Sequence, residues 1–404
     1  MNLKITALFC FMLGIQQVSQ AQTDSTLYKK VEKIVSEAKQ KYAPDKRTKI
    51  VALVQADAKN NQYVIESTEA EASQFLNKQL KGLKAKVNIK NLPDTSVSDK
   101  IYGVINLSVA NMRTQPGNAS EMATQSLLGT QVDILQKDRG EYRVRTPEGY
   151  ISYVPASSVV AMNKQEIADW KANKKLIYTQ EFGKSYSQAD QKSMRVSDLV
   201  YGDILALKGE SAAFYQVEYP DKRQAFIPKE EALTFEQWLS SRDLTSENVL
   251  ASAKTMMGLP YLWGGTSVKG VDCSGFTKTA YYMNGVVIPR DASQQVLVGD
   301  KIDILDKDGH FDSEKALKNL KPADLLFFAS GKNSNPNARV THVALYIGNG
   351  EFIHAAGTVR INSMLKNAQN YDDFQTRTVV AARRYIGAKD TQIQAVKDNA
   401  YYKK

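Results

Sequence analysis

The chain has 404 residues, of which 43% are hydrophobic and 24% are charged, and its formal net charge is +10. This length corresponds to roughly two to four domains, each able to bury a core. The basic excess comes without an arginine-rich run or a nucleic-acid motif. Nucleic acid is therefore not an expected partner, and the charge favours an anionic surface, such as a cell-wall polymer or membrane face, or serves solubility alone.

Residues 1–21 are predicted to be an export signal. They begin with Lys4, continue through the apolar residues 5–15 and end in small residues up to Ala21, as secretory signals do. The apolar run is too short for a membrane-spanning helix, which takes about 20 residues. Cys10 lies inside this run, which argues against a lipid-anchored cysteine. We expect an exported chain in a periplasm or cell envelope, with no transmembrane segment.

Residues 22–100 are predicted to form a small α/β unit. Apolar residues recur with a helical period over 24–43, and a second helix is expected over 70–83. Three strands are expected in the same region, over residues 49–55, 62–66 and 86–89. No chemistry is visible in this unit, so a binding or spacer role is the simplest expectation.

Residues 101–162 and 175–236 look like two copies of one small β-barrel. Short strands alternate with turns in both, as in small all-β modules. The run EYRVRTPEGYISYVP in the first copy corresponds to FYQVEYPDKRQAFIP in the second. Both copies resemble the bacterial SH3-like domains that accompany cell-wall hydrolases, and a helix is expected between them over residues 163–174.

Residues 245–386 form the last predicted domain. Thr245 can cap a helix that continues to about residue 257, and a glycine-rich loop, a second helix and several strands follow. Residues 387–404 are expected to be a polar tail that is loose at its end.

Cys273 is the single cysteine that remains if the export signal is removed. An unpaired thiol in an exported chain is a candidate reactive group. Asp272 is a good helix N-cap, which puts Cys273 in the first turn of a helix. There the helix dipole is expected to lower the pKa of the thiol, and backbone N–H groups can stabilise an oxyanion. The alternative is an inert, buried structural cysteine.

His342 and His354 follow on two strands joined near residues 348–350. With a three-residue loop, Ala344 faces His354, and the two histidines lie on one face as diagonal neighbours. A two-residue loop would put them on opposite faces. On the first register, His342 is predicted to be the base for Cys273 and His354 the residue that orients it. The alternative for each histidine is a satisfied polar residue of the sheet.

Metal binding is a competing use of one cysteine and two histidines, since these residues can ligate zinc. The spacing contains neither a C-x-x-C nor an H-x-x-x-H pair, so we expect no metal and no other cofactor. His310 lies in a polar loop with Asp306 and Asp308, but Phe311 stands where a calcium loop would need glycine. We expect that loop to be exposed and without a metal.

Three motifs stand in a fixed order in residues 250–385: Tyr261-Leu262-Trp263-Gly264-Gly265, Asp272-Cys273-Ser274-Gly275-Phe276 and Thr341-His342-Val343. Together they strongly resemble the NlpC/p60 family of cysteine peptidases. The resemblance implies a papain-like α+β domain, in which a helix bearing the cysteine packs on an antiparallel sheet. It implies cleavage of cell-wall stem peptides, typically between γ-D-glutamate and a diamino acid. It also implies the roles of nucleophile for Cys273, base for His342 and third, orienting residue for His354.

With the two SH3-like modules, the layout is similar to exported γ-D-glutamyl-L-diamino acid endopeptidases that require a free N-terminal L-alanine. This resemblance implies that Asp272 and Ser274, which flank the nucleophile, help to hold the substrate amine. A carboxylate beside an ammonium would exclude stems whose alanine is still acylated by the glycan.

The same resemblance implies further substrate-binding residues. Trp263 is expected to line the pocket and Tyr261 to lie near the attacked carbonyl, with core packing as the alternative for both. Glu121 or Tyr150 (or Tyr153) of the first module is expected to narrow the cleft. Ser293 is included, although the family often shows Arg-x-Ser where this chain has an extra residue before the serine.

Three functional hypotheses follow from the sequence. The first is an endopeptidase that cuts the γ-D-glutamyl–diamino acid bond of peptidoglycan stem peptides through a thioester acyl-enzyme, acting as a monomer. The second is a non-catalytic wall-binding protein. The third keeps the thiol chemistry but performs amidase or acyl-transfer reactions. The sequence leaves open whether the diamino acid is meso-diaminopimelate or lysine, and whether the substrate is intact wall or released fragments.

Overall fold

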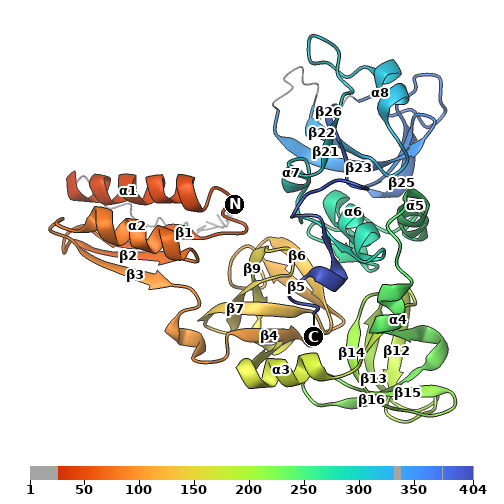
Figure 1. Cartoon of the computed structure of the whole chain (residues 1–404), viewed down its shortest axis with the longest axis horizontal. Coiled ribbons are helices and arrows are strands. Elements are labelled where there is room, and N and C mark those ends of the chain that lie inside the picture. The colour runs from red at the N-terminus through yellow and green to blue at the C-terminus, as the bar shows by residue number, and fades with distance from the viewer. Residues whose placement is uncertain (1–25, 332–337, 375, 404) are drawn as a thin grey trace, which may run out of the picture. The chain divides into compact units, whose positions relative to one another are not determined.

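The computed structural model describes residues 26–331, 338–374 and 376–403 (Figure 1). The predicted export signal over residues 1–21 lies outside the described residues. The chain divides into two compact units, Met1–Asn91 and Leu92–Lys404, which are described separately. Among the described residues, no helix has the length and apolar character needed to cross a membrane.

The first unit is a three-stranded sheet with two helices. Its strands lie in the order β1-β2-β3, with β1 antiparallel and β3 parallel to β2. Side chains from both helices and from β2 share one apolar core, which includes Val31, Ile65 and Leu76. Residues 26–91 hold 14 of the Lys and Arg residues against seven Asp and Glu, so the basic excess is concentrated here. The elements are α1 Thr26–Tyr42, β1 Val51–Asp57, β2 Gln62–Ser67, α2 Ala70–Leu80 and β3 Lys86–Asn91.

The second unit begins with a seven-stranded antiparallel sheet that curls around its own apolar core and is called the first sheet below. Its strand order is β10-β4-β7-β8-β9-β5-β6. Asn163 then caps a linking helix with a reciprocal contact from Glu166. The elements are η1 Thr95–Val97, β4 Tyr102–Ile105, β5 Val109–Arg113, β6 Met122–Leu127, β7 Gln131–Asp138, β8 Glu141–Arg145, β9 Ile151–Pro155, η2 Ala156–Ser158, β10 Val159–Met162 and the linking helix α3 Lys164–Ala172.

A second seven-stranded sheet follows with the order β13-β12-β16-β15-β14-β11-β17. Taken in chain order, its strands pair in the same pattern as those of the first sheet. The similar runs in the two segments thus form equivalent strand–turn–strand pairs, β8–β9 and β15–β16. The elements are β11 Lys175–Tyr178, β12 Phe182–Tyr186, β13 Arg195–Val200, β14 Ile204–Glu210, β15 Phe214–Glu218, β16 Gln224–Pro228, η3 Lys229–Glu231, β17 Ala232–Thr234 and the helix α4 Phe235–Ser240.

The last domain is built on a six-stranded antiparallel sheet with the order β21-β26-β22-β23-β24-β25. Alternate side chains face two cores, as the period of a strand requires. Phe327 and Leu345 pack with Phe276 of α6 on one face, whereas Phe328 and Phe352 belong to the core on the other face. The elements are α5 Ser246–Thr255, β18 Thr266–Ser267, β19 Gly270–Val271, α6 Cys273–Tyr282, β20 Val286–Val287, α7 Ala292–Gln295, β21 Asp300–Ile302, α8 Ser313–Asn319, β22 Leu325–Ser330, β23 Val340–Gly348, β24 Glu351–Ala356, β25 Thr358–Ser363, β26 Arg377–Arg384, β27 Gln394–Ala395 and η4 Val396–Asp398.

The C-terminal tail is packed, so the prediction of a loose end was wrong. β27 pairs with β20 of the last domain, and Tyr401 donates a hydrogen bond to Asp133 Oδ2 of the first sheet at 2.7 Å. The ring of Tyr402 lies between those of Phe235 and Tyr282, with centroid distances of 6.3 Å to each. The two adjacent aromatic residues explain the error, because they bury enough apolar surface to hold an otherwise polar segment.

Candidate active site

Cys273 is the first residue of α6, as the sequence predicted, and Asp272 is the N-cap. Asp272 Oδ1 accepts a hydrogen bond from the backbone N–H of Gly275 at 2.7 Å, and Oδ2 accepts one from the N–H of Gly264 at 2.9 Å. A side chain at position 275 would meet the carbonyl oxygen of Gly265 at 1.9 Å. Gly275 is therefore needed for the loop at 264–265 to lie directly against the start of the helix.

Arg290 connects the start of α6 to the first sheet. Its guanidinium donates to Asp272 at 2.6 and 3.1 Å and to Ser274 Oγ at 2.9 Å. Its Nε donates to Thr124 Oγ1 of β6 at 2.9 Å, so one side chain joins the catalytic helix to the first sheet. Arg290 is 1% exposed, and the charge of Asp272 raises its pKa despite burial. Arg290 was not assigned a role in the site from the sequence.

These contacts change the expected roles of Asp272 and Ser274. Both side chains are buried, and both are already bonded to Arg290. Asp272 also carries the two N–H contacts of the loop and helix. Its charge is thus neutralised inside the protein, which leaves no free carboxylate for a substrate amine. The expectation that these two residues hold the amine is not supported by their contacts, and we assign them to the support of the nucleophile.

The thiol of Cys273 is buried and contacts the strand that carries His342. Sγ lies 3.9 Å from the carbonyl oxygen of Thr341, and the backbone of Val343 also bonds to the sulfur. Burial, and then the charge of Asp272, raise the pKa of Cys273 to about 12. The predicted lowering by the helix start is therefore outweighed, and the resting group is a neutral thiol that needs a base.

His342 and His354 lie on one face and are joined, with Nε2 of His342 2.8 Å from Nδ1 of His354. The loop is shorter than expected, because Gly348 pairs directly with Glu351 around a two-residue turn. An irregularity at Ile347 restores the predicted register, since Tyr346 pairs with Phe352 and Leu345 with Ile353. An extra residue of this kind is a β-bulge, and it compensates for the missing loop residue.

Asn362 of β25 fixes the direction of this pair. Its Nδ2 donates to the carbonyl of Asn370 at 3.1 Å, which turns Oδ1 toward His354 Nε2 at 3.0 Å. On that orientation, His354 carries its proton on Nε2 and accepts at Nδ1 from the Nε2–H of His342. The lone pair of His342 is then on Nδ1, the nitrogen left for the thiol. The sequence did not predict Asn362.

Both imidazoles are held neutral. Burial, and then the charges of His354 and Arg377, keep the pKa of His342 well below its ordinary value. Burial also lowers the pKa of His354 to about 3, although the bond to Asn362 opposes this. Arg377 of β26 is a further residue that the sequence did not predict, with its NH1 3.2 Å from His342 Nε2 and its Nε 3.5 Å from Asp372 Oδ2. Because NH1 and the protonated Nε2 are both donors in this tautomer, Arg377 acts on His342 through its charge and not through a hydrogen bond.

Two carboxylates stand where the first sheet meets the catalytic domain. Trp263 Nε1 donates to Glu121 Oε1 at 2.9 Å, and the Tyr150 hydroxyl donates to Asp291 Oδ2 at 3.2 Å. Trp263 is 59% exposed, which excludes core packing as its role. Asp291 precedes α7 and is part of the segment in which the chain departs from Arg-x-Ser. The pairing of Glu121 with Trp263 and of Tyr150 with Asp291 could not be deduced from separations of about 140 residues.

Of the remaining predicted residues, Tyr261 lies near the thiol, whereas His310 lies in an exposed loop. Burial, and then the charges of Cys273 and Asp272, raise the pKa of Tyr261. The Tyr261 hydroxyl is therefore close enough to the thiol to interact with it electrostatically. Ser293 is half-buried on α7. His310 is exposed and 3.7 Å from Asp306. Among the described residues, no three His, Cys, Asp or Glu side chains gather as ligands of a metal ion.

A buried thiol at a helix start, beside two paired strands that each carry one of two joined imidazoles, is the arrangement of a thiol-dependent hydrolase. The sequence model of the NlpC/P60 family matches residues 258–382, and that of the bacterial dipeptidyl-peptidase Sh3 domain matches residues 112–159. The chain belongs to the NlpC/P60 family and is a cysteine peptidase with the papain-like fold, as predicted. The SH3 match falls in the first of the two predicted SH3-like modules, and the assignment of the second stays a prediction.

Named relatives agree with this assignment. The chain is 30% identical over 282 residues to the γ-D-glutamyl-L-lysine dipeptidyl-peptidase of Bacillus cereus, covering 67% of this chain and 77% of that protein. It is 27% identical over 288 residues to dipeptidyl-peptidase 6 of Lysinibacillus sphaericus, covering 68% and 95%. A crystal structure of an NlpC/P60 family protein from Bacillus cereus matches with a TM-score of 0.57 and 25% identity, over 70% of this chain and 99% of that one.

Proposed function

We propose that this peptidase hydrolyses the γ-D-glutamyl–diamino acid bond of peptidoglycan stem peptides whose N-terminal L-alanine is free. The observation that carries the proposal is the pair of carboxylates, Glu121 and Asp291, held at the seam between the first sheet and the catalytic domain. The names of the Bacillus and Lysinibacillus relatives support it, since they denote removal of a dipeptide, and one names the γ-D-glutamyl-L-lysine bond.

The carboxylates supply the selection for a free amine. Two negative groups with polar partners offer charge-assisted hydrogen bonds to an ammonium, and an acylated alanine offers neither the charge nor the donors. Glu121 and Tyr150 come from the first sheet, whereas Trp263 and Asp291 come from the catalytic domain. In this proposal, the two carboxylates select substrates that begin two residues before the scissile bond. In this role Asp291 replaces Asp272.

The chemistry begins with proton transfer from the Cys273 thiol to Nδ1 of His342. The resulting thiolate attacks the γ-carbonyl carbon of D-glutamate, and N–H groups of the first turn of α6 stabilise the oxyanion. The His342 imidazolium then gives its proton to the amine of the leaving diamino acid, which leaves a thioester on Cys273. His342 next takes a proton from water, whose oxygen attacks the thioester carbonyl. The carbon–sulfur bond then breaks, the L-Ala–γ-D-Glu dipeptide leaves with a free γ-carboxyl group, and the His342 imidazolium returns its proton to the Cys273 thiolate.

The joined imidazoles support this cycle. His354 accepts a hydrogen bond from the Nε2–H of His342 and donates one from its own Nε2–H to Asn362. The His342 ring, which transfers the protons, therefore keeps one orientation throughout the cycle. No hydrogen bond joins Sγ to either imidazole in the described part of the chain, so the thiol must shift toward Nδ1 when substrate binds. Catalytic contacts are often long in structures without ligand.

The export signal and the cell-envelope location are part of the same proposal, because the substrate lies outside the cytoplasm. The diamino acid is tested directly. Purified protein is incubated with L-Ala–γ-D-Glu–L-Lys, with the meso-diaminopimelate tripeptide and with the N-acetylated form of each, and products are identified by mass spectrometry. Release of L-Ala–γ-D-Glu from a free tripeptide, and not from its acetylated form, supports the proposal. Intact wall material is incubated in parallel, and cleavage of its glycan–alanine amide, with the tripeptides left intact, would assign the enzyme to the amidases.

A further inference from the structure

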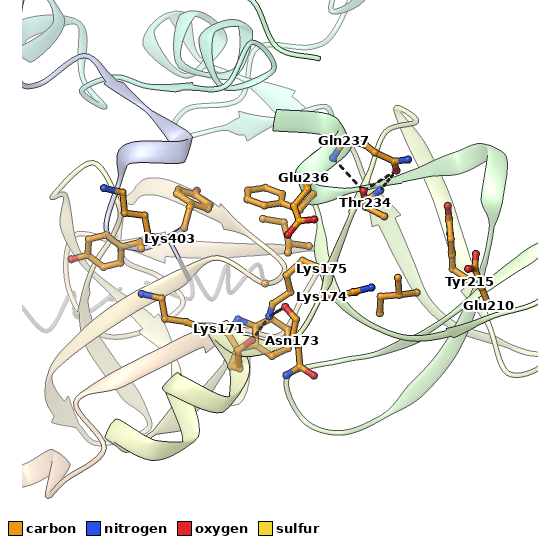
Figure 2. A pocket seen from close by; sticks show the side chains of 17 residues that line it. Lys171, Asn173, Lys174, Lys175, Glu210, Tyr215, Thr234, Glu236, Gln237 and Lys403 are labelled. Carbon is orange, nitrogen blue, oxygen red and sulfur yellow. Dashed lines mark hydrogen bonds between the residues drawn. The ribbon is translucent and has the colours of Figure 1, made fainter. Parts of the chain in front are cut away.

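A cavity of about 320 Å³ lies in the unit Leu92–Lys404, and the catalytic residues do not line it (Figure 2). Its walls come from five parts of the chain that are far apart in sequence. They are the turn between β6 and β7 at Gly129, the end of α3 with the residues after it, β14 and β15 of the second sheet, the start of α4, and the C-terminal tail. Cys273 and His342 are not among the residues that line it. A pocket at the junction of modules is a common place for a ligand site.

The charge lining this pocket is mainly positive. Lys171, Lys174, Lys175 and Lys403 face it, against two glutamates. One of these, Glu210, is paired with Lys229 at 2.8 Å. Figure 2 shows Lys171 and Lys403 toward one end of the pocket and Lys174 and Lys175 nearer its middle. The lining therefore complements an anion.

The lysines differ in how far they are already satisfied. Lys171 donates to the carbonyl of Ala400 at 3.0 Å, and Lys175 lies over the ring of Trp170, with its ammonium 4.4 Å from the ring centroid. Lys174 and Lys403 are exposed, and their ammonium groups make no hydrogen bond or ion pair in the part of the chain that the structure describes, although the charge of Lys174 helps to lower the pKa of Glu210. Two ammonium groups are thus free to receive a ligand.

The other lining groups favour a compact body with an apolar side. Trp170, Phe235 and Tyr402 present aromatic rings, and Ile204 and Leu207 add aliphatic surface. Aromatic faces pack on flat, partly apolar molecules, while ammonium groups bind their carboxylates. A cavity of this volume takes a single sugar or a dipeptide, which excludes a polymer strand or a membrane as its occupant.

We propose that this pocket is a second ligand site, which binds a small carboxylate-bearing saccharide or peptide through Lys174 and Lys403. Both sources share the same chemistry, a carboxylate on a compact body. The site does not depend on the reaction proposed above. Because its walls join α3, the second sheet, α4 and the tail, a bound ligand also stabilises the contacts among these elements.

The test is calorimetric titration of the Cys273→Ala protein, which cannot turn over a substrate. The probes are N-acetylmuramic acid, the dipeptide L-Ala–γ-D-Glu, and N-acetylglucosamine as the neutral sugar. We expect one of the two carboxylate probes, and not the neutral sugar, to bind. Because the dipeptide is also the product of the proposed reaction, the source of the ligand is assigned by the probe whose binding the lysine substitutions weaken.

The double substitution Lys174→Ala/Lys403→Ala should then weaken binding at least about 10-fold, which corresponds to the loss of one to two charge-assisted hydrogen bonds. The matched control is Lys184→Ala/Lys192→Ala, which removes two exposed lysines of the second sheet that lie outside the pocket. It should leave the affinity within about twofold. On the wild-type background, both double variants should cleave the tripeptide at the wild-type rate, which separates this site from the catalytic cleft.

Three results would overturn the proposal. They are no binding of either carboxylate probe up to about 10 mM, equal binding of the neutral sugar, and equal affinity in the Lys174→Ala/Lys403→Ala protein and its control. Thermal unfolding of both double variants checks that neither has lost its fold.

Discussion

Replacing Arg290 by methionine tests the support of the nucleophile. The substitution keeps most of the side-chain length and removes the guanidinium that bonds to Asp272, Ser274 and Thr124. Asp272 is 7% exposed, so the change leaves a buried carboxylate without its counter-ion. Breaking a buried pair in this way costs about 3–5 kcal/mol.

Differential scanning calorimetry measures this loss. At about 2–4 °C per kcal/mol for a domain of 150–250 residues, Arg290→Met is expected to lower the Tm of the catalytic domain by roughly 6–20 °C. The carboxylate, no longer neutralised, also raises the pKa of the neighbouring thiol further, so activity falls with stability. Arg290→Lys keeps the charge but loses the two-pronged contact, and an intermediate loss is expected.

The double substitution Asp272→Asn/Arg290→Met distinguishes this reasoning from simple loss of packing. Without the carboxylate there is no uncompensated charge, so the double variant is expected to be more stable than Arg290→Met alone. A Tm for Arg290→Met within 2 °C of wild type, or losses that add in the double variant, would refute the argument.

Three further substitutions test the remaining contacts. Arg377→Gln removes a cation that lowers the pKa of His342, so the limb of the pH–kcat/KM profile governed by this imidazole should move to higher pH. Arg377→Lys keeps the charge and should leave the limb in place. A limb that does not move in Arg377→Gln contradicts this role of Arg377. Asn362→Leu should lower kcat about 10-fold or more, because His354 loses the acceptor that fixes its tautomer, and unchanged kcat would exclude it. Asp291→Asn should raise KM for the free tripeptide about 10-fold or more, with Asp190→Asn as an exposed control; equal KM values would place the amine elsewhere.

The parts of the site that follow from local patterns were predictable from the sequence. Asp272 before a helical period puts Cys273 in the first turn, and the alternation of a strand puts His342 and Ala344 on one face. The register across the turn was less secure. The two-residue turn would have placed the histidines on opposite faces, and the irregularity at Ile347, which nothing in the sequence indicated, restored the pairing.

Contacts between distant segments account for what the sequence did not reveal. Arg290 and Thr124 are separated by 166 residues, and their bond exists only because the first sheet packs against the catalytic helix. The pKa of the thiol also depends on this packing, since burial and the charge of Asp272 outweigh the helix start. Asp272 looks like a substrate ligand until its partner is known.

The central claim is that Glu121 and Asp291 select a stem peptide with a free N-terminal amine and that the Cys273 thiol cleaves it. Mass spectrometry of L-Ala–γ-D-Glu–diamino acid digests, free and N-acetylated, with wild-type and Cys273→Ala protein, tests it most directly. The account predicts release of L-Ala–γ-D-Glu from the free tripeptide by the wild-type protein alone. Cleavage of the acetylated tripeptide at a similar rate, or cleavage that persists in Cys273→Ala, would contradict it.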